Sequence, residues 1–167
     1  MAEIAPWSPV DRDDVLAFIV AIQRGEFGIE ITAEEQPDLA DVGGAYQAGG
    51  GEFWVARADG EVGGTIAAIR IAEDAVALRK MFVGAEHRGD GLAARLMETL
   101  VEWARREGVR TIYLGTTAVM SAAHRFYEKW GFRLIEKSEL PPAFPVMAVD
   151  SRFYALSLRT PAPPART

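Results

Sequence analysis

The sequence has no cysteine, and among its 167 residues only His87 and His124 are histidines. Without cysteine, disulfides, thiolate nucleophiles and cysteine metal sites are all excluded. Two histidines are also too few for a typical histidine-based metal centre, so we expect no bound metal. Any catalysis has to rely on other side chains and on the backbone.

Long apolar runs and an excess of positive charge are absent as well. No run approaches the roughly 20 residues that span a membrane, and residues 1–7 lack the basic start and apolar stretch of a signal peptide. The formal net charge is -6, whereas proteins that bind nucleic acid through phosphate contacts normally present a basic face. We therefore expect a cytoplasmic protein with no membrane or nucleic-acid partner.

Hydrophobic residues are plentiful: they make up 49% of the chain, enough to bury the core of one compact domain. Neither an internal repeat nor a linker divides the sequence. We expect a single domain over residues 1–160 and a disordered, proline-containing tail over residues 161–167.

The hydrophobic periodicity predicts alternating helices and strands. Helices are expected near residues 15–25, 39–46, 92–106 and 121–130, and strands near residues 53–58, 61–71, 76–83, 110–114, 132–136 and 153–158. Asp59-Gly60 is a strong two-residue turn signal that joins the first two strands into a hairpin. This order predicts an α/β fold with a mixed sheet.

A glycine-containing loop, Arg88-Gly89-Asp90-Gly91-Leu92-Ala93, separates a predicted strand from a strongly amphipathic helix. At a helix start several backbone N–H groups lack intrahelical partners, and the helix dipole adds positive potential. Gly89 and Gly91 let a ligand approach the backbone, and Arg88 adds a charge. The loop therefore predicts a site for a phosphate or pyrophosphate.

Other interpretations of this loop are weaker. Gly89-x-Gly91-x-x-Ala94 formally matches a dinucleotide fingerprint, but the preceding strand contains Arg79 and Lys80 and follows an antiparallel hairpin. A nucleotide P-loop requires a Gly-Lys-Ser/Thr sequence that is absent here. An ordinary glycine turn at a helix start would explain the six residues taken alone.

The similarity to a known family extends beyond these six residues. Over a longer stretch the chain resembles the GNAT superfamily of acetyl-CoA-dependent N-acetyltransferases. Residues 88–93 fit its Gln/Arg-x-x-Gly-x-Gly/Ala motif, and the strand that ends in residues 78–83 precedes the motif as in the family. A second signature follows, Ala123-x-x-x-Tyr127-x-x-x-Gly131-Phe132. The resemblance is strong over residues 53–136 and favours an enzyme over an isolated glycine turn.

This resemblance implies a single GNAT-like α/β domain. Its central sheet would be mixed, mostly antiparallel and flanked by helices, with a splayed pair of parallel strands forming the CoA cleft. The pyrophosphate would lie on the loop amides, and the pantetheine arm would pair with the preceding strand as an added strand does. The implied acetyl-CoA-binding residues are Met81, Phe82, Val83, Arg88, Gly89, Asp90, Gly91, Leu92, Ala93 and Ala94.

The implied reaction is transfer of acetyl from acetyl-CoA to a primary amine of a small molecule or protein. The absence of cysteine excludes an acetyl-cysteine intermediate, so direct attack in a ternary complex is expected. Tyr127 occupies the family's general-acid position; as an aromatic beside Phe126 and Trp130, it would otherwise be a packing residue. The glutamate that many members carry is missing from residues 113–117, and Met120 replaces a frequent asparagine.

The acceptor pocket is expected from the N-terminal helices and the last strands. Candidates are Phe27, Glu30, Tyr46, Arg79, His124, Phe144, Asp150, Arg152 and Tyr154. Strand alternation places Arg79 and Lys80 on opposite faces, and a buried cation there needs a carboxylate from the protein or the substrate. A non-catalytic acyl-CoA-binding sensor of the same fold is the alternative function. A homodimer that pairs through residues 146–158 is expected.

Overall fold

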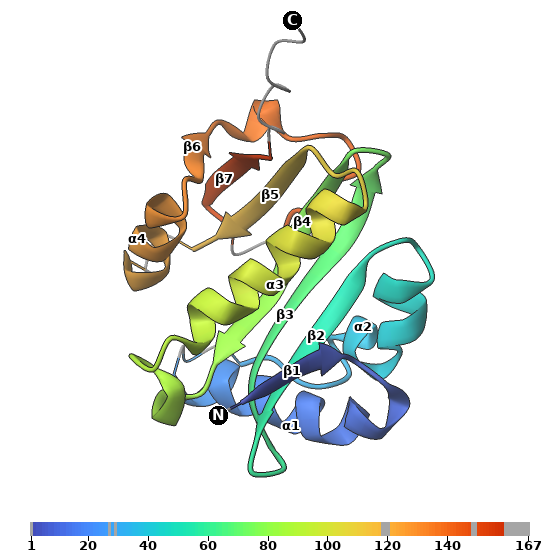
Figure 1. Ribbon diagram of the computed structural model, residues 1–167, viewed down its shortest axis with the longest axis vertical. Coiled ribbons are helices and arrows are strands. Elements are labelled where there is room, and N and C mark those ends of the chain that lie inside the picture. Colours follow the sequence, from blue (N-terminus) through green and yellow to red (C-terminus); the bar gives the residue numbers. More distant parts are fainter. Residues whose placement is uncertain (1, 27, 29, 118–120, 148–149, 159–167) are drawn as a thin grey trace, which may run out of the picture. The chain divides into compact units, whose positions relative to one another are not determined.

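The computed structural model describes a seven-stranded mixed sheet with helices around it (Figure 1). The described residues are 2–26, 28, 30–117, 121–147 and 150–158. The strands are β1 Glu3–Pro6, β2 Glu52–Ala58, β3 Glu61–Ala72, β4 Ala75–Val83, β5 Thr111–Thr116, β6 Arg133–Ile135 and β7 Arg152–Ser157. Their order across the sheet is β1-β2-β3-β4-β5-β7-β6.

The pairing confirms a mixed and mostly antiparallel sheet. β1–β2, β2–β3, β5–β7 and β6–β7 are antiparallel pairs. β4 and β5 pair in parallel, with Ala75–Ala77 opposite Thr111–Tyr113. The expected hairpin between β2 and β3 is also confirmed, because Asp59 and Gly60 both have positive φ, 53° and 80°, as a type I′ turn requires.

Three long helices follow the predicted amphipathic segments. The helices are α1 Arg12–Gly25, α2 Pro37–Ala40, α3 Leu92–Arg106 and α4 Ser121–Lys129, with short helical turns η1 Pro9–Asp11, η2 Gly43–Gln47, η3 Ala85–His87 and η4 Lys137–Glu139. The single helix predicted over residues 39–46 is wrong, because Asp41 leaves the helical region at φ -141° and its carboxylate accepts the Gly44 N–H. α2 and the π-helical turn η2 replace it.

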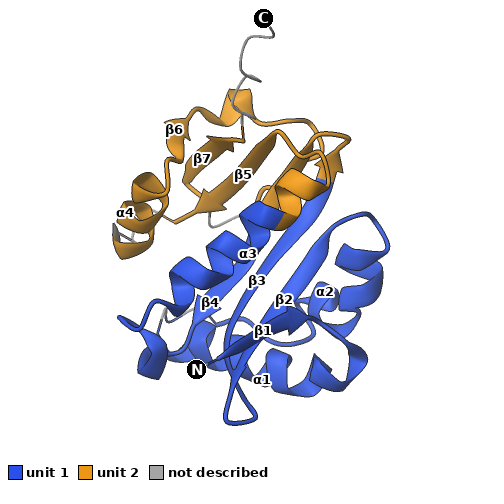
Figure 2. Cartoon of the chain, viewed as in Figure 1, with its two compact units in different colours: residues 1–70, 78–102 blue, residues 71–77, 103–167 orange. Residues whose placement is uncertain are grey.

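The chain forms two compact units (Figure 2). The first comprises residues 1–70 and 78–102, and the second comprises residues 71–77 and 103–167. The core of the first includes Val15, Ile19, Leu39, Val42, Tyr46, Phe53 and Val55. Buried side chains of the second include Ile112, Leu114, Tyr127, Phe132, Phe153 and Tyr154. The predicted tail, residues 161–167, lies outside the described residues.

Two features of the sheet were not predicted. One is β1, a four-residue edge strand that ends in Pro6 and is too short to show alternation. β7 lies between β5 and β6, so both of its edges are hydrogen-bonded within the chain. The strand inside the expected dimer contact, residues 146–158, therefore offers no open edge. No helix of the described residues is long and apolar enough to cross a membrane.

Candidate active site

The backbone of the loop before α3 is left-handed at two glycines. Gly89 and Gly91 have φ of 86° and 89°, a left-handed conformation that favours glycine. A Cβ built on either residue would meet no protein atom within 4 Å. Close packing therefore does not account for glycine at these two positions. The left-handed backbone conformation does, because residues with a side chain rarely adopt it. The space above both residues is open to a ligand.

Asp90 caps the helix that follows this loop. Its Oδ1 accepts the Leu92 N–H at 3.0 Å, and its Oδ2 lies 3.0 Å from His87 Nδ1. The hydrogen bond with His87, followed by that from Leu92, holds the pKa of Asp90 below its usual value. The cap fixes the start of α3 and occupies one backbone amide among those expected to bind pyrophosphate.

Arg88 and the end of β4 flank the loop. The Arg88 guanidinium forms an ion pair with Glu26, just after α1, and donates to the Val83 carbonyl at 3.2 Å. Both side chains of the pair are partly exposed, so the interaction is easily exchanged. Met81, Phe82 and Val83 are half-buried. The predicted cofactor-binding residues, 81–83 and 88–94, thus all belong to the first unit.

The backbone of β4 is irregular at Lys80. Its φ of 53° is left-handed, and the Thr65 hydroxyl donates to its carbonyl at 2.7 Å. This interrupts the extended geometry on which the predicted alternation of Arg79 and Lys80 rests. The Lys80 side chain is only 8% exposed, and its Nζ lies 3.7 Å from Asp38 Oδ2. One of the two basic residues therefore has the internal carboxylate partner that burial requires.

The remaining first-unit candidates differ in their surroundings. Glu30 is exposed, Arg79 is half-buried and Tyr46 is fully buried. Tyr46 donates its hydroxyl hydrogen to Asp38 Oδ2 at 2.6 Å. Phe27 lies outside the described residues. The pairing of Asp38 with Lys80 and Tyr46 was not predicted, since an acidic residue in the first turn of α2 is an ordinary helix-start signal.

In the second unit, His124 is held in a fixed orientation. It is 4% exposed. Arg152 Nη1 donates to its Nδ1 at 3.1 Å, so the proton is assigned to Nε2, which donates to the Thr117 carbonyl at 2.8 Å. Because both ring nitrogens are engaged, this geometry does not favour His124 as a free general base.

Tyr127 lies in an aromatic cluster of the second unit. Its ring packs against Phe126, Phe132 and Tyr154 with centroid distances of 5.7–6.1 Å. Burial raises the pKa of Tyr127 to about 12. A phenol of this kind keeps its proton at neutral pH and can act as a donor. Tyr154 donates to Glu128 at 2.7 Å and is 6.1 Å from His124 between ring centroids.

Phe144 is buried and packs edge-on against Phe153, with 6.2 Å between the ring centroids. Asp150 completes the predicted acceptor residues. Its Oδ2 accepts the Met147 N–H at 2.9 Å. A Cβ built on Gly115 would lie 2.6 Å from the same oxygen, so the carboxylate packs directly against β5. His124, Tyr127 and Asp150 all belong to the second unit.

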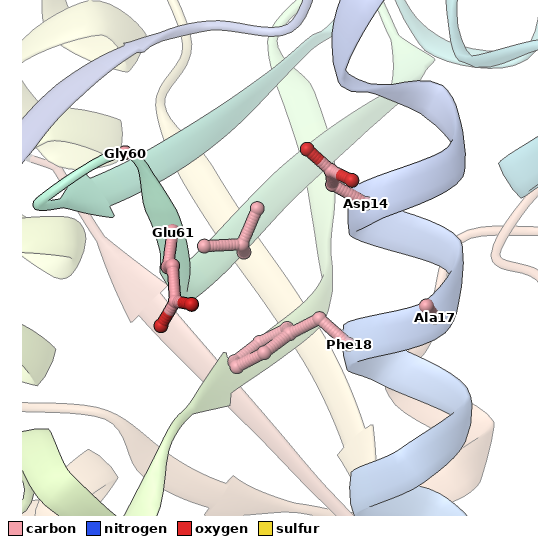
Figure 3. A pocket seen from close by; sticks show the side chains of 6 residues that line it. Asp14, Ala17, Phe18, Gly60 and Glu61 are labelled. Carbon is pink, nitrogen blue, oxygen red and sulfur yellow. The ribbon is translucent and has the colours of Figure 1, made fainter.

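A separate hollow of about 370 Å³ lies beside α1 and the β2–β3 turn (Figure 3). Its lining residues are Asp14, Ala17, Phe18, Gly60, Glu61 and Val62. Asp14 already pairs with Arg57 at 3.0 Å. None of the predicted site residues lines this hollow, so it is not part of the candidate active site.

Comparisons with known proteins agree on one family. The model of the Acetyltransferase (GNAT) family matches residues 16–132. The chain is 40% identical over 104 residues to the N-acetylaspartate synthetase of Danio rerio, covering 61% of this chain and 37% of that protein. It is 35% identical over 150 residues to the uncharacterized N-acetyltransferase YjgM of Escherichia coli (strain K12), covering 81% of this chain and 89% of that protein. The chain thus spans well under half of the length of the N-acetylaspartate synthetase.

Solved structures show the same relationship. A GNAT-family acetyltransferase from Staphylococcus aureus Mu50 has a TM-score of 0.91 and 33% identity, covering 95% of this chain and 100% of that chain. The protein yncA of Salmonella typhimurium, solved with its cofactor acetyl-CoA, has a TM-score of 0.73 and 22% identity, covering 100% of this chain and 99% of that chain. At 22% identity, the similarity to yncA shows a common fold only.

Proposed function

The chain belongs to the GNAT family of acetyltransferases, and on that premise we propose that it transfers acetyl from acetyl-CoA to a primary amine of a small molecule. The name of one relative, N-acetylaspartate synthetase, describes a small acetylated product, which favours a small acceptor over a protein. Membership in the family supports a reaction that depends on acetyl-CoA. The loop before α3 is the observation that carries the placement of the cofactor.

The residues of the first unit suit a CoA pyrophosphate. Two left-handed glycines leave open space above the backbone, and the first turn of α3 presents amides and the positive end of the helix dipole. Arg88 would exchange Glu26 for a phosphate oxygen. The backbone of Met81–Val83 would pair with the amides of the pantetheine arm. These residues bind and orient the cofactor.

The chemistry is direct transfer within a ternary complex. When bound, acetyl-CoA supplies a thioester whose C–S bond breaks as the amine nitrogen bonds to the acetyl carbon. An alkylammonium, with an ordinary pKa near 10.4, must first lose a proton. Water is the acceptor of that proton in this proposal, since β5 carries no carboxylate over Thr111–Thr116. Tyr127 donates its hydroxyl proton toward the departing sulfur, and the second proton that the amine nitrogen loses as the amide forms returns through water to the Tyr127 oxygen.

Steady-state kinetics tests this proposal. Release of free CoA thiol is measured with a panel of primary amines, for wild type and Tyr127→Phe. We expect turnover to fall by about 10²–10⁴-fold in Tyr127→Phe, with acetyl-CoA affinity unchanged, because only the hydroxyl is lost. Tyr113→Phe, a change of the same kind on β5, is the control.

Two results would contradict parts of the proposal. Equal turnover of wild type and Tyr127→Phe would make Tyr127 a packing residue. Tight acetyl-CoA binding with no turnover of any amine would instead favour the non-catalytic acyl-CoA sensor, the alternative suggested by the missing carboxylate on β5.

A further inference from the structure

The backbone N–H groups of the loop before α3 fall into two sets. Three are hydrogen-bonded within the loop itself. Arg88 N donates to the Ala85 carbonyl at 3.3 Å, Asp90 N to the His87 carbonyl at 3.4 Å, and Leu92 N to Asp90 Oδ1 at 3.0 Å. The amides that have no hydrogen-bond partner among the described residues are those of Gly89, Gly91, Ala93 and Ala94. This second set is left for a phosphate.

His87 takes part in several of the internal contacts. Its N–H donates to the Gly84 carbonyl at 2.9 Å, its carbonyl accepts Asp90 N, and its Nδ1 lies 3.0 Å from Asp90 Oδ2. Asp90, whose pKa lies below its usual value, is ionised at neutral pH and can only accept hydrogen bonds. The proton is therefore assigned to Nδ1, which donates to the carboxylate that caps Leu92.

Strand β3 fixes the position of the His87 ring. Gly63 is buried, and a Cβ built on it would lie 2.7 Å from both Cδ2 and Nε2 of His87. A side chain at this position would displace the ring. The Gly63 carbonyl also accepts the Gly84 N–H at 2.8 Å. The turn that contains His87 is thus attached to β3 by a backbone hydrogen bond and by a ring that packs on a glycine.

The Asp90 carboxylate is a potential competitor of a bound phosphate. Its side chain is 49% exposed, and it lies beside amides that have no partner among the described residues. A carboxylate accepts hydrogen bonds from the same backbone donors as a phosphate, and its negative charge repels one. With His87 on one oxygen and the Leu92 amide on the other, both oxygens of Asp90 are engaged.

We infer that His87 is a positioning residue of the proposed cofactor site: its imidazole, packed on Gly63, keeps the Asp90 carboxylate on the Leu92 amide and away from the amides that bind the CoA pyrophosphate. The inference rests on the proposed function. His87 acts through Asp90 and does not touch the cofactor. Its loss should therefore change the affinity for CoA and the KM for acetyl-CoA, and leave kcat unchanged.

Two variants of similar shape separate the hydrogen bond from packing. His87→Asn places an amide N–H donor at the position of Nδ1, whereas His87→Leu is branched in the same way and has no donor. Calorimetric titration with CoA should show about tenfold weaker binding in His87→Leu, as loss of a charge-assisted hydrogen bond does, and a loss within about threefold in His87→Asn. Urea unfolding of both variants is the control for folding, and His87→Ala replaces His87→Leu if the latter does not fold.

A second measurement shows whether His87 acts through Asp90. Asp90→Asn keeps an oxygen that can cap Leu92 but removes the negative charge. In the Asp90→Asn background His87→Leu should no longer weaken CoA binding, because the side chain at position 90 no longer repels the phosphate. A ring that only fills space would cause the same loss in both backgrounds.

The outcomes separate this inference from the proposed function. An unchanged affinity in His87→Leu, equal losses in His87→Leu and His87→Asn, or a loss that persists in the Asp90→Asn background would each overturn the positioning role. All three leave the cofactor site standing, since wild type still binds CoA. Absence of CoA binding by wild type would overturn the proposed function and this inference together.

Discussion

The loop before α3 and the cluster around Lys80 lie in the same unit but are built in opposite ways. The loop uses consecutive residues: Gly89 and Gly91 set the backbone, and the Asp90 side chain caps Leu92 two positions on. The cluster joins Lys80 to Gln36, which is 44 positions away in the sequence, and to Asp38. The loop is exposed, whereas the Lys80 and Tyr46 side chains are buried.

This difference separates cofactor binding from stability. An exposed loop of backbone donors suits a ligand part that is the same for every substrate, since amides bind any phosphate. A buried cluster of charged side chains affects stability instead, because an unpaired buried charge is costly. We therefore expect changes in the loop to alter cofactor affinity and changes in the cluster to alter stability.

The largest expected effect is that of Gly91→Val on the loop. A β-branched side chain is strained at φ 89° and fills the open space above the backbone. CoA affinity should fall by at least about 100-fold, from combined strain and steric blocking. Calorimetric titration with CoA measures it. Gly60→Val is the matched control, since Gly60 has φ 80° and equally open surroundings in the β2–β3 turn. Unchanged affinity in Gly91→Val would rule out the loop as the pyrophosphate site.

Tyr46→Phe should destabilise the buried cluster while leaving CoA affinity intact. It removes the hydrogen bond to Asp38, a loss of about 1.5–3 kcal/mol in the free energy of unfolding for a charged acceptor. Urea unfolding at pH 8 measures this. An equally weakened CoA affinity would show that the cluster and the loop do not act separately.

The same variant has a pH signature. Burial raises the pKa of Tyr46 above its ordinary value. Its contribution to stability is therefore fully present below about pH 10 and is lost as the pH rises, because the unfolded chain ionises first. Between pH 10 and 11 wild type should lose about 1 kcal/mol more than Tyr46→Phe, because the unfolded phenol goes from half to mostly ionised over this interval. Parallel losses in the two proteins would contradict the raised pKa.

Arg88→Ala tests the charged part of the loop. The Arg88 side chain is half-exposed, so its contact with a phosphate should contribute at the lower end of the range for charge-assisted hydrogen bonds. We expect the substitution to cost about 1.5 kcal/mol of binding free energy, or roughly tenfold in CoA affinity. Titration with inorganic pyrophosphate and with CoA should show the same loss. Arg133→Ala, an exposed arginine of β6, serves as the control. An unaltered affinity would assign Arg88 to its contact with Glu26 alone.

The smallest effect is expected from Glu26→Gln. Glu26 holds Arg88 before the cofactor arrives, and removing its charge frees the guanidinium. CoA affinity should rise by no more than about fivefold, the value of a surface ion pair. The rise should vanish in the double variant with Arg88→Ala. A fall in affinity would mean that Glu26 positions Arg88 for the phosphate rather than competing with it.

Local signals in the sequence were predicted well. The hairpin turn at Asp59-Gly60, the start of α3 at Leu92 and its end near Gly108 are all as expected, since glycine conformation and helix capping act over a few residues. The sheet order was not predicted. β1 has too few residues to show a period, and nothing in the sequence of β7 indicates that it lies between β5 and β6.

The family resemblance and the phosphate-binding loop could be recognised from consecutive residues, because backbone geometry at a helix start depends on its immediate neighbours. Folding alone decided that Lys80 would face Asp38, and that Arg152 and Thr117 would fix the ring of His124. Those contacts join distant segments whose charges and hydrogen bonds compensate one another only after burial. The sequence indicates that a cation in a buried strand must be paired, but tertiary packing determines which residue pairs with it.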